Sequence, residues 1–268
     1  MTAFDPSNPL TFYVGSTAAP GNPPLVKSTN GGPLTWVGSG ITSGSGAGIF
    51  NGLAVDPNNP QTVYYGLGQL WRSQNGAANW SAVSGATGAP IAAIAVNPAN
   101  SGEVIFGNNN GLIFHGSANA WTSVQPRSAY VSSFAFDPQH EGVIYASYST
   151  FRMQSTDSQL YVSSDHGATW SALGVASLPD IPVHTVVVDP ASPSTLYIGT
   201  DMGVFVSFDS GNTWSHDNSF PNVITESLVV QSSGPRVEYL YAFTHGRGAW
   251  KARLRESRGA GGTVNVGR

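Results

Sequence analysis

The sequence predicts an all-β fold, a β-propeller of about six four-stranded antiparallel blades. Three observations indicate it: an Asx-Pro pair that recurs after a short apolar run, a β-rich run that follows each pair, and a turn of the form Ser-x-Asx-x-Gly-x-Thr-Trp. The Asx-Pro pairs are spaced by 56−5=51, 97−56=41, 137−97=40 and 189−137=52 residues. A repeat of this length with four short β runs is typical of a propeller blade.

The first strand of each predicted blade ends at the Asx-Pro pair, because proline cannot donate to a ladder of hydrogen bonds. A sixth run lacks the pair but has the same apolar pattern. The six runs are Ala3–Pro6, Ala54–Pro57, Ala95–Pro98, Ala135–Pro138, Val187–Pro190 and Ser227–Gln231.

The second strand is rich in β-branched and aromatic residues and usually ends in glycine or another small residue. Its copies are Thr11–Gly15, Val63–Gly66, Val104–Gly107, Val143–Ala146, Leu196–Gly199 and Leu240–Phe243.

A third strand leads into the Ser-x-Asx-x-Gly-x-Thr-Trp turn, and a fourth strand starts near its tryptophan. In this turn we expect the Asx side chain to accept backbone N–H groups, the glycine to adopt a positive φ and the indole to pack between blades. Ser163–Trp170 and Ser207–Trp214 are complete copies. Ser73–Trp80 is close, Ser28–Trp36 has one extra residue, His115–Trp121 is eroded, and the sixth repeat has none.

The predicted propeller spans residues 1–256, followed by a Gly-rich tail at 257–268, in which Thr263–Val266 would add a last strand. Either the chain closes into a six-bladed ring, which leaves no exposed sheet edge and which we favour, or it is a piece of a larger propeller or multidomain protein. The blades are predicted at roughly 1–40, 49–84, 90–125, 130–174, 182–217 and 223–255.

Composition excludes several classes of function. The 268 residues have a formal net charge of −4 and 11 Lys+Arg, which argues against a nucleic-acid partner. The sequence contains no Cys, so disulfides, thiolate metal sites and a Cys nucleophile are excluded. No apolar run approaches the ~20 residues of a membrane span, and the first residues do not resemble a signal peptide.

The turns and the Asx-Pro runs resemble the BNR/Asp-box propeller superfamily. Its members include sialidases, xyloglucan-cleaving tandem propellers, sortilin-type receptors and a photosystem assembly factor. Tyr197–Phe205 and Tyr241–Trp250 are similar to segments of secreted bacterial proteins described as glycosyl hydrolase-like. The resemblance implies the propeller fold and an extracellular or cell-surface location, but not one function.

Strand order places the Ser-x-Asx-x-Gly-x-Thr-Trp turns at one end of every blade. The other end carries the loops that join the second strand to the third and the loops that join one blade to the next. The longest of these loops, Gly38–Gly52 and Ser147–Gln159, are candidate binding loops. Arg127 and Arg152 are the other cations on this side, and the structural alternative for isolated cations is that they are only solvated. The predicted binding residues are Tyr130, Arg152, His184, Asp201, Glu226, His245 and Arg247.

Each candidate has a structural alternative. Asp201 and Arg247 lie at equivalent turns and could satisfy turn backbones, and His184 could be a hydrogen-bonded structural histidine. His184, Asp201 and His245 could also form an N/O metal site, but their spacing is not diagnostic.

A glycosidase needs two carboxylates, for which Asp201 and Glu226 are a candidate pair. No Arg-Ile-Pro or Arg-Leu-Pro segment of the sialidases occurs, and no Ser-His-Asp constellation is evident. We therefore assign no catalytic residue and no cofactor.

The leading hypothesis is a non-catalytic extracellular propeller that binds a glycan or a protein. The alternatives are a glycoside hydrolase that uses mouth-side carboxylates, and a structural spacer or subunit that associates with itself or with other domains.

Overall fold

The computed structural model describes residues 2–15, 25–37, 41, 52–117, 120–232 and 238–254. The chain is a β-propeller of six antiparallel sheets, each with three or four strands, as predicted. Only strands, turns and loops occur in the described residues, so none of them forms a helix that is long and apolar enough to cross a membrane. The chain divides into two compact units, Met1–Val131 and Ser132–Arg268.

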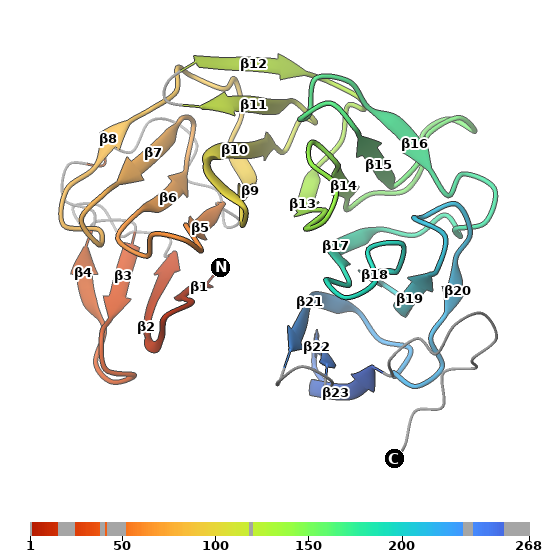
Figure 1. Ribbon diagram of the computed structural model, residues 1–268. Coiled ribbons are helices and arrows are strands. Elements are labelled where there is room, and N and C mark those ends of the chain that lie inside the picture. Colours follow the sequence, from red (N-terminus) through yellow and green to blue (C-terminus); the bar gives the residue numbers. More distant parts are fainter. Residues whose placement is uncertain are drawn as a thin grey trace. The chain divides into compact units, whose positions relative to one another are not determined.

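The first unit contains three sheets whose strands follow one another in chain order (Figure 1). The strands are β1 (Thr2–Asp5), β2 (Asn8–Gly15), β3 (Leu25–Ser28) and β4 (Thr35–Val37); β5 (Leu53–Val55), β6 (Val63–Gly66), β7 (Leu70–Ser73) and β8 (Ser81–Ala82); β9 (Ile91–Asn97), β10 (Asn100–Asn108), β11 (Ile113–Ser117) and β12 (Ala120–Val124).

The second unit contains the other three sheets, and the boundary between the units falls after the first residue of β13. The strands are β13 (Val131–Phe136), β14 (Ile144–Tyr148), β15 (Leu160–Ser163) and β16 (Ser171–Leu173); β17 (Val183–Val188), β18 (Leu196–Thr200), β19 (Gly203–Ser207) and β20 (Ser215–His216); β21 (Thr225–Ser232), β22 (Glu238–Thr244) and β23 (Gly248–Leu254). The sixth sheet thus has three described strands.

The core lies between neighbouring sheets inside each unit. Burial on both faces explains why the second strands are continuous apolar runs rather than alternating ones. Every residue of β6, β14 and β18 is buried. One apolar cluster joins the fourth and fifth sheets through Tyr145, Leu196 and Phe205, and another joins the fifth and sixth through Tyr197 and Leu240.

The small residue at the end of the second strand allows the next sheet to approach. A Cβ atom on Gly66 would lie 2.6 Å from Ile91, and one on Gly107 would lie 2.6 Å from Val131. A Cβ atom on Gly199 would lie 2.5 Å from the carbonyl oxygen of Thr225. The recurring glycine therefore sets the spacing between the sheets.

The two complete Ser-x-Asx-x-Gly-x-Thr-Trp turns share one hydrogen-bond pattern. In the first, Asp165 Oδ1 accepts the backbone N–H of Thr169 at 2.8 Å, and the Ser163 hydroxyl accepts that of Gly167 at 2.8 Å. Hydrogen bonds from the Thr169 side chain and backbone lower the pKa of Asp165 to about 2. The second turn repeats these bonds at Asp209 and Ser207. The turns thus satisfy their own polar groups.

Asp189, in the Asx-Pro pair of the fifth repeat, is a buried acid with a raised pKa. Burial, together with the nearby Glu238 carboxylate, raises its pKa to about 6. Its Oδ1 accepts the N–H groups of Ala191 and Ser192. Asn97 accepts the N–H of Ala99 in the same way in the third repeat, so a neutral amide fits this turn.

We expect Asp189→Asn to stabilise the protein at pH 7. A folded-state pKa raised above the ordinary 3.8 gives stability that is present below pH ~4 and is lost as the pH rises through ~6. The neutral amide removes that loss, so the free energy of unfolding should rise by on the order of 1–2 kcal/mol at pH 7. The difference from the wild type should vanish near pH 4. Urea unfolding at both pH values measures it. A variant that is less stable at pH 7 would show that the carboxylate is required there.

Several predictions fall on residues outside the described ranges. They concern the loop Gly38–Gly52, of which Ile41 and Gly52 are described, the tail at 257–268 and the last strand at Thr263–Val266. Closure of the ring stays a prediction.

Candidate functional site

Polar residues occupy one repeated position near the start of the inner strands of the second unit. The position lies five residues before the Asx of the Asx-Pro pair or its counterpart: 137−132 for Ser132, 189−184 for His184 and 231−226 for Glu226. The third repeat has Ala92 there. Alignment of the repeats thus places three polar side chains at corresponding points of neighbouring sheets.

Irregular pairing exposes this position. Val183 pairs with Thr200 and Thr185 with Gly199, which leaves His184 unpaired between them. The register shifts in the same way around Glu226, between Thr225 and Ser227. A bulge of this kind redirects a side chain and is common next to functional sites.

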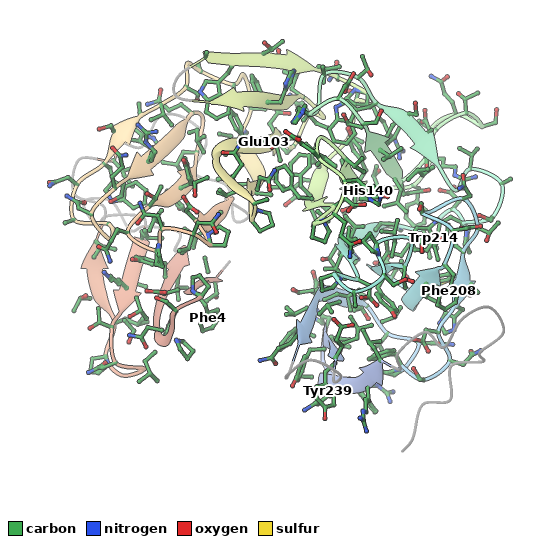
Figure 2. All side chains as sticks on the ribbon, viewed as in Figure 1. Phe4, Glu103, His140, Phe208, Trp214 and Tyr239 are labelled. Atoms are coloured by element: carbon green, nitrogen blue, oxygen red, sulfur yellow. The ribbon has the colours of Figure 1, made fainter. Side chains whose placement is uncertain are left out.

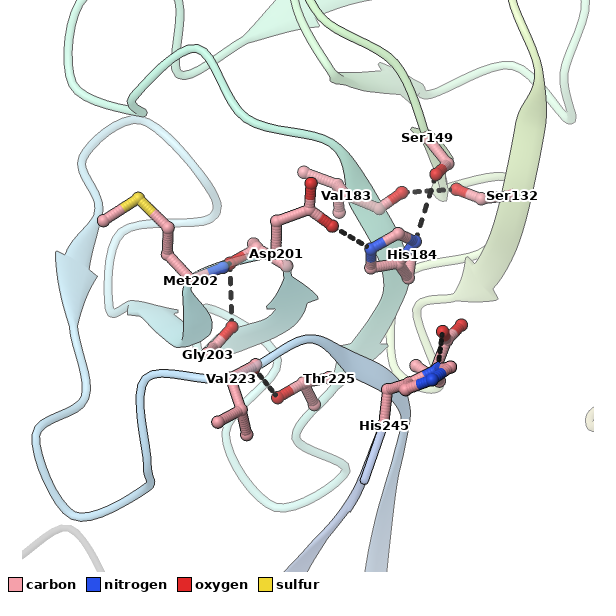
Figure 3. A network of polar contacts seen from close by, with 12 residues as sticks. Ser132, Ser149, Val183, His184, Asp201, Met202, Gly203, Val223, Thr225 and His245 are labelled. Atoms are coloured by element: carbon pink, nitrogen blue, oxygen red, sulfur yellow. Dashed lines mark hydrogen bonds and ion pairs between the residues drawn. The ribbon is translucent and has the colours of Figure 1, made fainter. Parts of the chain in front are cut away.

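His184 lies at the centre of a polar network (Figure 3). Its Nε2 lies 2.7 Å from Asp201 Oδ1, in the turn after β18, and its Nδ1 lies 3.0 Å from Ser149 Oγ, just after β14. The His184 side chain is 17% exposed and that of Asp201 is 36% exposed. The network is held by the protein and remains open to solvent.

The backbone beside His184 is held by the preceding sheet. Ser132 Oγ donates to the carbonyl oxygen of Val183 at 2.6 Å and lies 2.8 Å from Ser147 Oγ. The Asp201 turn is closed by Thr200, whose hydroxyl donates to the carbonyl of Gly203 at 2.8 Å. Gly203 adopts φ 100°, which favours glycine. Both partners of the His184–Asp201 pair therefore have fixed backbones.

Glu226 and His245 form a second, looser pair in the sixth sheet. Glu226 Oε1 lies 3.7 Å from His245 Nδ1, and the two side chains are 54% and 73% exposed. The histidine and the acid have exchanged places relative to His184 and Asp201. An exposed pair at this distance contributes little to stability, which leaves the carboxylate accessible.

Arg152, one of the predicted binding residues, makes its hydrogen bonds within the chain. Its guanidinium donates to the carbonyl oxygen of Leu178 at 2.7 Å and to Gln159 Oε1 at 3.4 Å, and its backbone N–H donates to Asp180 at 2.7 Å. These bonds tie the loop after β14 to the loop before β17. Arg127, the other of these two cations, is buried.

Arg247 and Tyr130 are the remaining predicted residues. Arg247 is exposed in the turn after β22, where its carbonyl oxygen accepts the indole N–H of Trp250 at 3.2 Å. Tyr130 is half-buried and precedes β13 in the first unit. The described residues bring no three His, Asp or Glu side chains into an arrangement that could hold a metal ion.

The structure adds Ser149 to the candidate site, and sequence reasoning did not name this residue. No Ser-His-Asp constellation was evident from spacing, yet Ser149, His184 and Asp201 form a continuous hydrogen-bonded chain. Sequence reasoning named His184 and Asp201. Ser149 has no signal in the sequence, because it begins an irregular loop whose path only the folded chain decides.

Comparison with known proteins gives a consistent fold and one distant sequence match. A probable oligoxyloglucan-reducing end-specific xyloglucanase from Neosartorya fischeri is 30% identical in a 145-residue alignment that covers 45% of this chain and 17% of that protein. No family model matches the chain.

Solved structures of GH74 proteins have the same fold. An ancestral GH74 enzyme matches with a TM-score of 0.76 and 18% identity over 100% of this chain and 37% of its own. The GH74 xyloglucanase from Xanthomonas campestris matches with a TM-score of 0.66 and 20% identity over 94% of this chain and 44% of its own. This chain therefore spans less than half the length of these proteins, and the identities show the fold alone.

Proposed function

We propose that this chain is a propeller of a glycoside hydrolase that acts on a xyloglucan-like polysaccharide. The observation that carries the proposal is the 30% identity to a xyloglucanase. The propeller fold shared with GH74 enzymes is compatible with it. A polysaccharide substrate also places the protein outside the cell, and that location is part of the proposal.

Asp201 and Glu226 are the carboxylates that we propose for this chemistry. Glycoside hydrolysis uses one carboxylic acid to protonate the leaving oxygen and a second carboxylate to activate water or to attack the sugar. The two acids belong to adjoining sheets of the second unit, and each faces a histidine. Phe151 and Trp250, which are 56% and 42% exposed, offer apolar surface to sugar rings.

The repeated turns are part of the same proposal. We infer that Ser163–Trp170 and Ser207–Trp214 are Asp-box repeats. The shared hydrogen bonds at Asp165 and Asp209 support this, and they give the turns a structural role rather than a role in binding.

We expect the protein to release reducing ends from xyloglucan. Asp201→Asn and Glu226→Gln should each lower the rate by about 100-fold or more, the usual contribution of a general acid or base. Glu141→Gln is the matched control, because Glu141 is an exposed acid in the turn between β13 and β14. Unchanged rates in both site variants would remove these residues from the mechanism.

A non-catalytic binding module is the second candidate. It is favoured by the bonds that the charged groups of this region already make within the chain, at Arg152 and at His184. Retention on immobilised xyloglucan without release of sugars would support it, and Trp250→Ala should then weaken retention. If the protein were neither retained on xyloglucan nor able to release sugars from it, a structural or protein-binding role would be favoured.

A further inference from the structure

The Ser149–His184–Asp201 chain has the connectivity of an activated serine nucleophile. Asp201 Oδ1 lies 2.7 Å from Nε2 of the imidazole, and Ser149 Oγ lies 3.0 Å from Nδ1. A carboxylate at Nε2 holds the ring proton there, so Nδ1 presents its lone pair to the serine hydroxyl. The base is thus within reach of the nucleophile and is itself oriented by a third group.

We propose that Ser149 is the nucleophile of an ester-hydrolysing site, with His184 as the general base and Asp201 as the residue that orients it. Relative to the usual triad, the two ring nitrogens are exchanged. The roles are preserved, because one nitrogen holds the proton for the carboxylate and the other faces the hydroxyl. This activity is separate from the glycosidase function proposed above.

The reaction balances without a cofactor. Ser149 Oγ bonds to the ester carbonyl carbon while its proton passes to His184 Nδ1. The C–O bond to the alcohol then breaks, and the alcohol leaves with that proton. Water, deprotonated by the same nitrogen, releases the acid and restores Ser149.

The surroundings of Ser149, His184 and Asp201 favour an ester carried by a large molecule. Ser149 and His184 are half-buried, and the Asp201 side chain is 36% exposed, so an acyl group at the surface of a polymer can reach them. The bulge at His184 and the bond from Ser132 to Val183 fix the imidazole-bearing backbone before substrate arrives. We therefore expect O-acylated sugars as the class of substrate; that they are sugars rests on the proposed function.

Covalent labelling tests the nucleophile without any glycan. A fluorophosphonate probe should attach to Ser149, as located by peptide mass spectrometry, and 4-nitrophenyl acetate should be hydrolysed. Ser149→Ala should abolish labelling, and His184→Gln should slow both reactions by about 100-fold or more. Asp201→Asn should also slow both reactions. The label arises only from a reactive hydroxyl, so loss of a structural hydrogen bond alone would not mimic this pattern.

Ser155→Ala is the matched control, because Ser155 is an exposed serine of the same loop. It should leave labelling and hydrolysis unchanged, and thermal unfolding of each variant should show that it is folded. Labelling that is absent in the wild type, or equal in Ser149→Ala, would overturn the proposal. Failure of xyloglucan cleavage would not affect it, since the probe and the small ester contain no sugar.

Discussion

Replacing Trp214 by alanine is expected to lower the free energy of unfolding by about 3–5 kcal/mol, the usual cost of truncating a buried tryptophan. Trp214 (labelled in Figure 2) is 9% exposed and belongs to the apolar cluster of the fourth and fifth sheets. Its indole N–H donates to the carbonyl of Gly211 at 2.9 Å. Its ring lies against Gly174, where a Cβ atom would be 2.8 Å away. The variant therefore opens a cavity between two sheets.

Trp170 provides a matched control for this prediction. It ends the other complete turn, and its indole N–H makes the same bond, to Gly167, at 2.9 Å. It is only half-buried, and its ring centroid lies 6.5 Å from that of Phe134. Trp170→Ala should therefore cost clearly less than Trp214→Ala when both are compared by urea unfolding. Equal losses would show that the turn, rather than the packing of the indole, determines the stability.

Replacing Gly199 by valine is expected to destabilise the protein by about 3 kcal/mol, at the upper end of the usual cost of overpacking. A Cβ atom on Gly199 would lie 2.5 Å from the carbonyl oxygen of Thr225 and 2.8 Å from the Thr185 side chain. Since the nearest atom belongs to the backbone, the fifth and sixth sheets would have to separate. Relief by a change of rotamer is not available.

Gly85→Ala serves as the control for the glycine prediction, because nothing lies within 4 Å of a Cβ atom at Gly85. Its unfolding midpoint should match that of the wild type. Gly199→Ala should lie between wild type and Gly199→Val. If Gly199→Val unfolded at the wild-type midpoint, the spacing between these sheets would not depend on the glycine.

The sixth sheet has a large residue at the end of its second strand, where the other sheets usually have a small one. Phe243 takes the position that Gly199 has in the fifth sheet, and it is 44% exposed. Gly66, Gly107 and Gly199 each face the first strand of the following sheet, and a Cβ atom there would clash with it. The exposed Phe243 side chain is not restricted in this way. The recurring glycine thus reflects a neighbour in space rather than a requirement of its own strand.

The site shows a similar division between pattern and geometry. The candidate list named His184, Asp201, Glu226 and His245, and the structure pairs them two by two. The same list named Arg152 as a binding residue, but its guanidinium donates to a carbonyl oxygen of the chain itself. Cations and loop residues are hard to place from sequence, because their partners come from segments that have no fixed spacing.

The repeat by itself was sufficient to predict the six-sheet propeller and the order of strands within each sheet. The signals in the repeat act locally, so their spacing is visible in the chain. Proline lacks a hydrogen-bond donor and ends a strand, apolar runs are buried, and the Gly-x-Thr-Trp turns need a glycine with positive φ. Only the tertiary structure decided that Ser149 meets His184. That contact joins a loop of one sheet to a bulge of the next, and depends on packing between segments 35 residues apart.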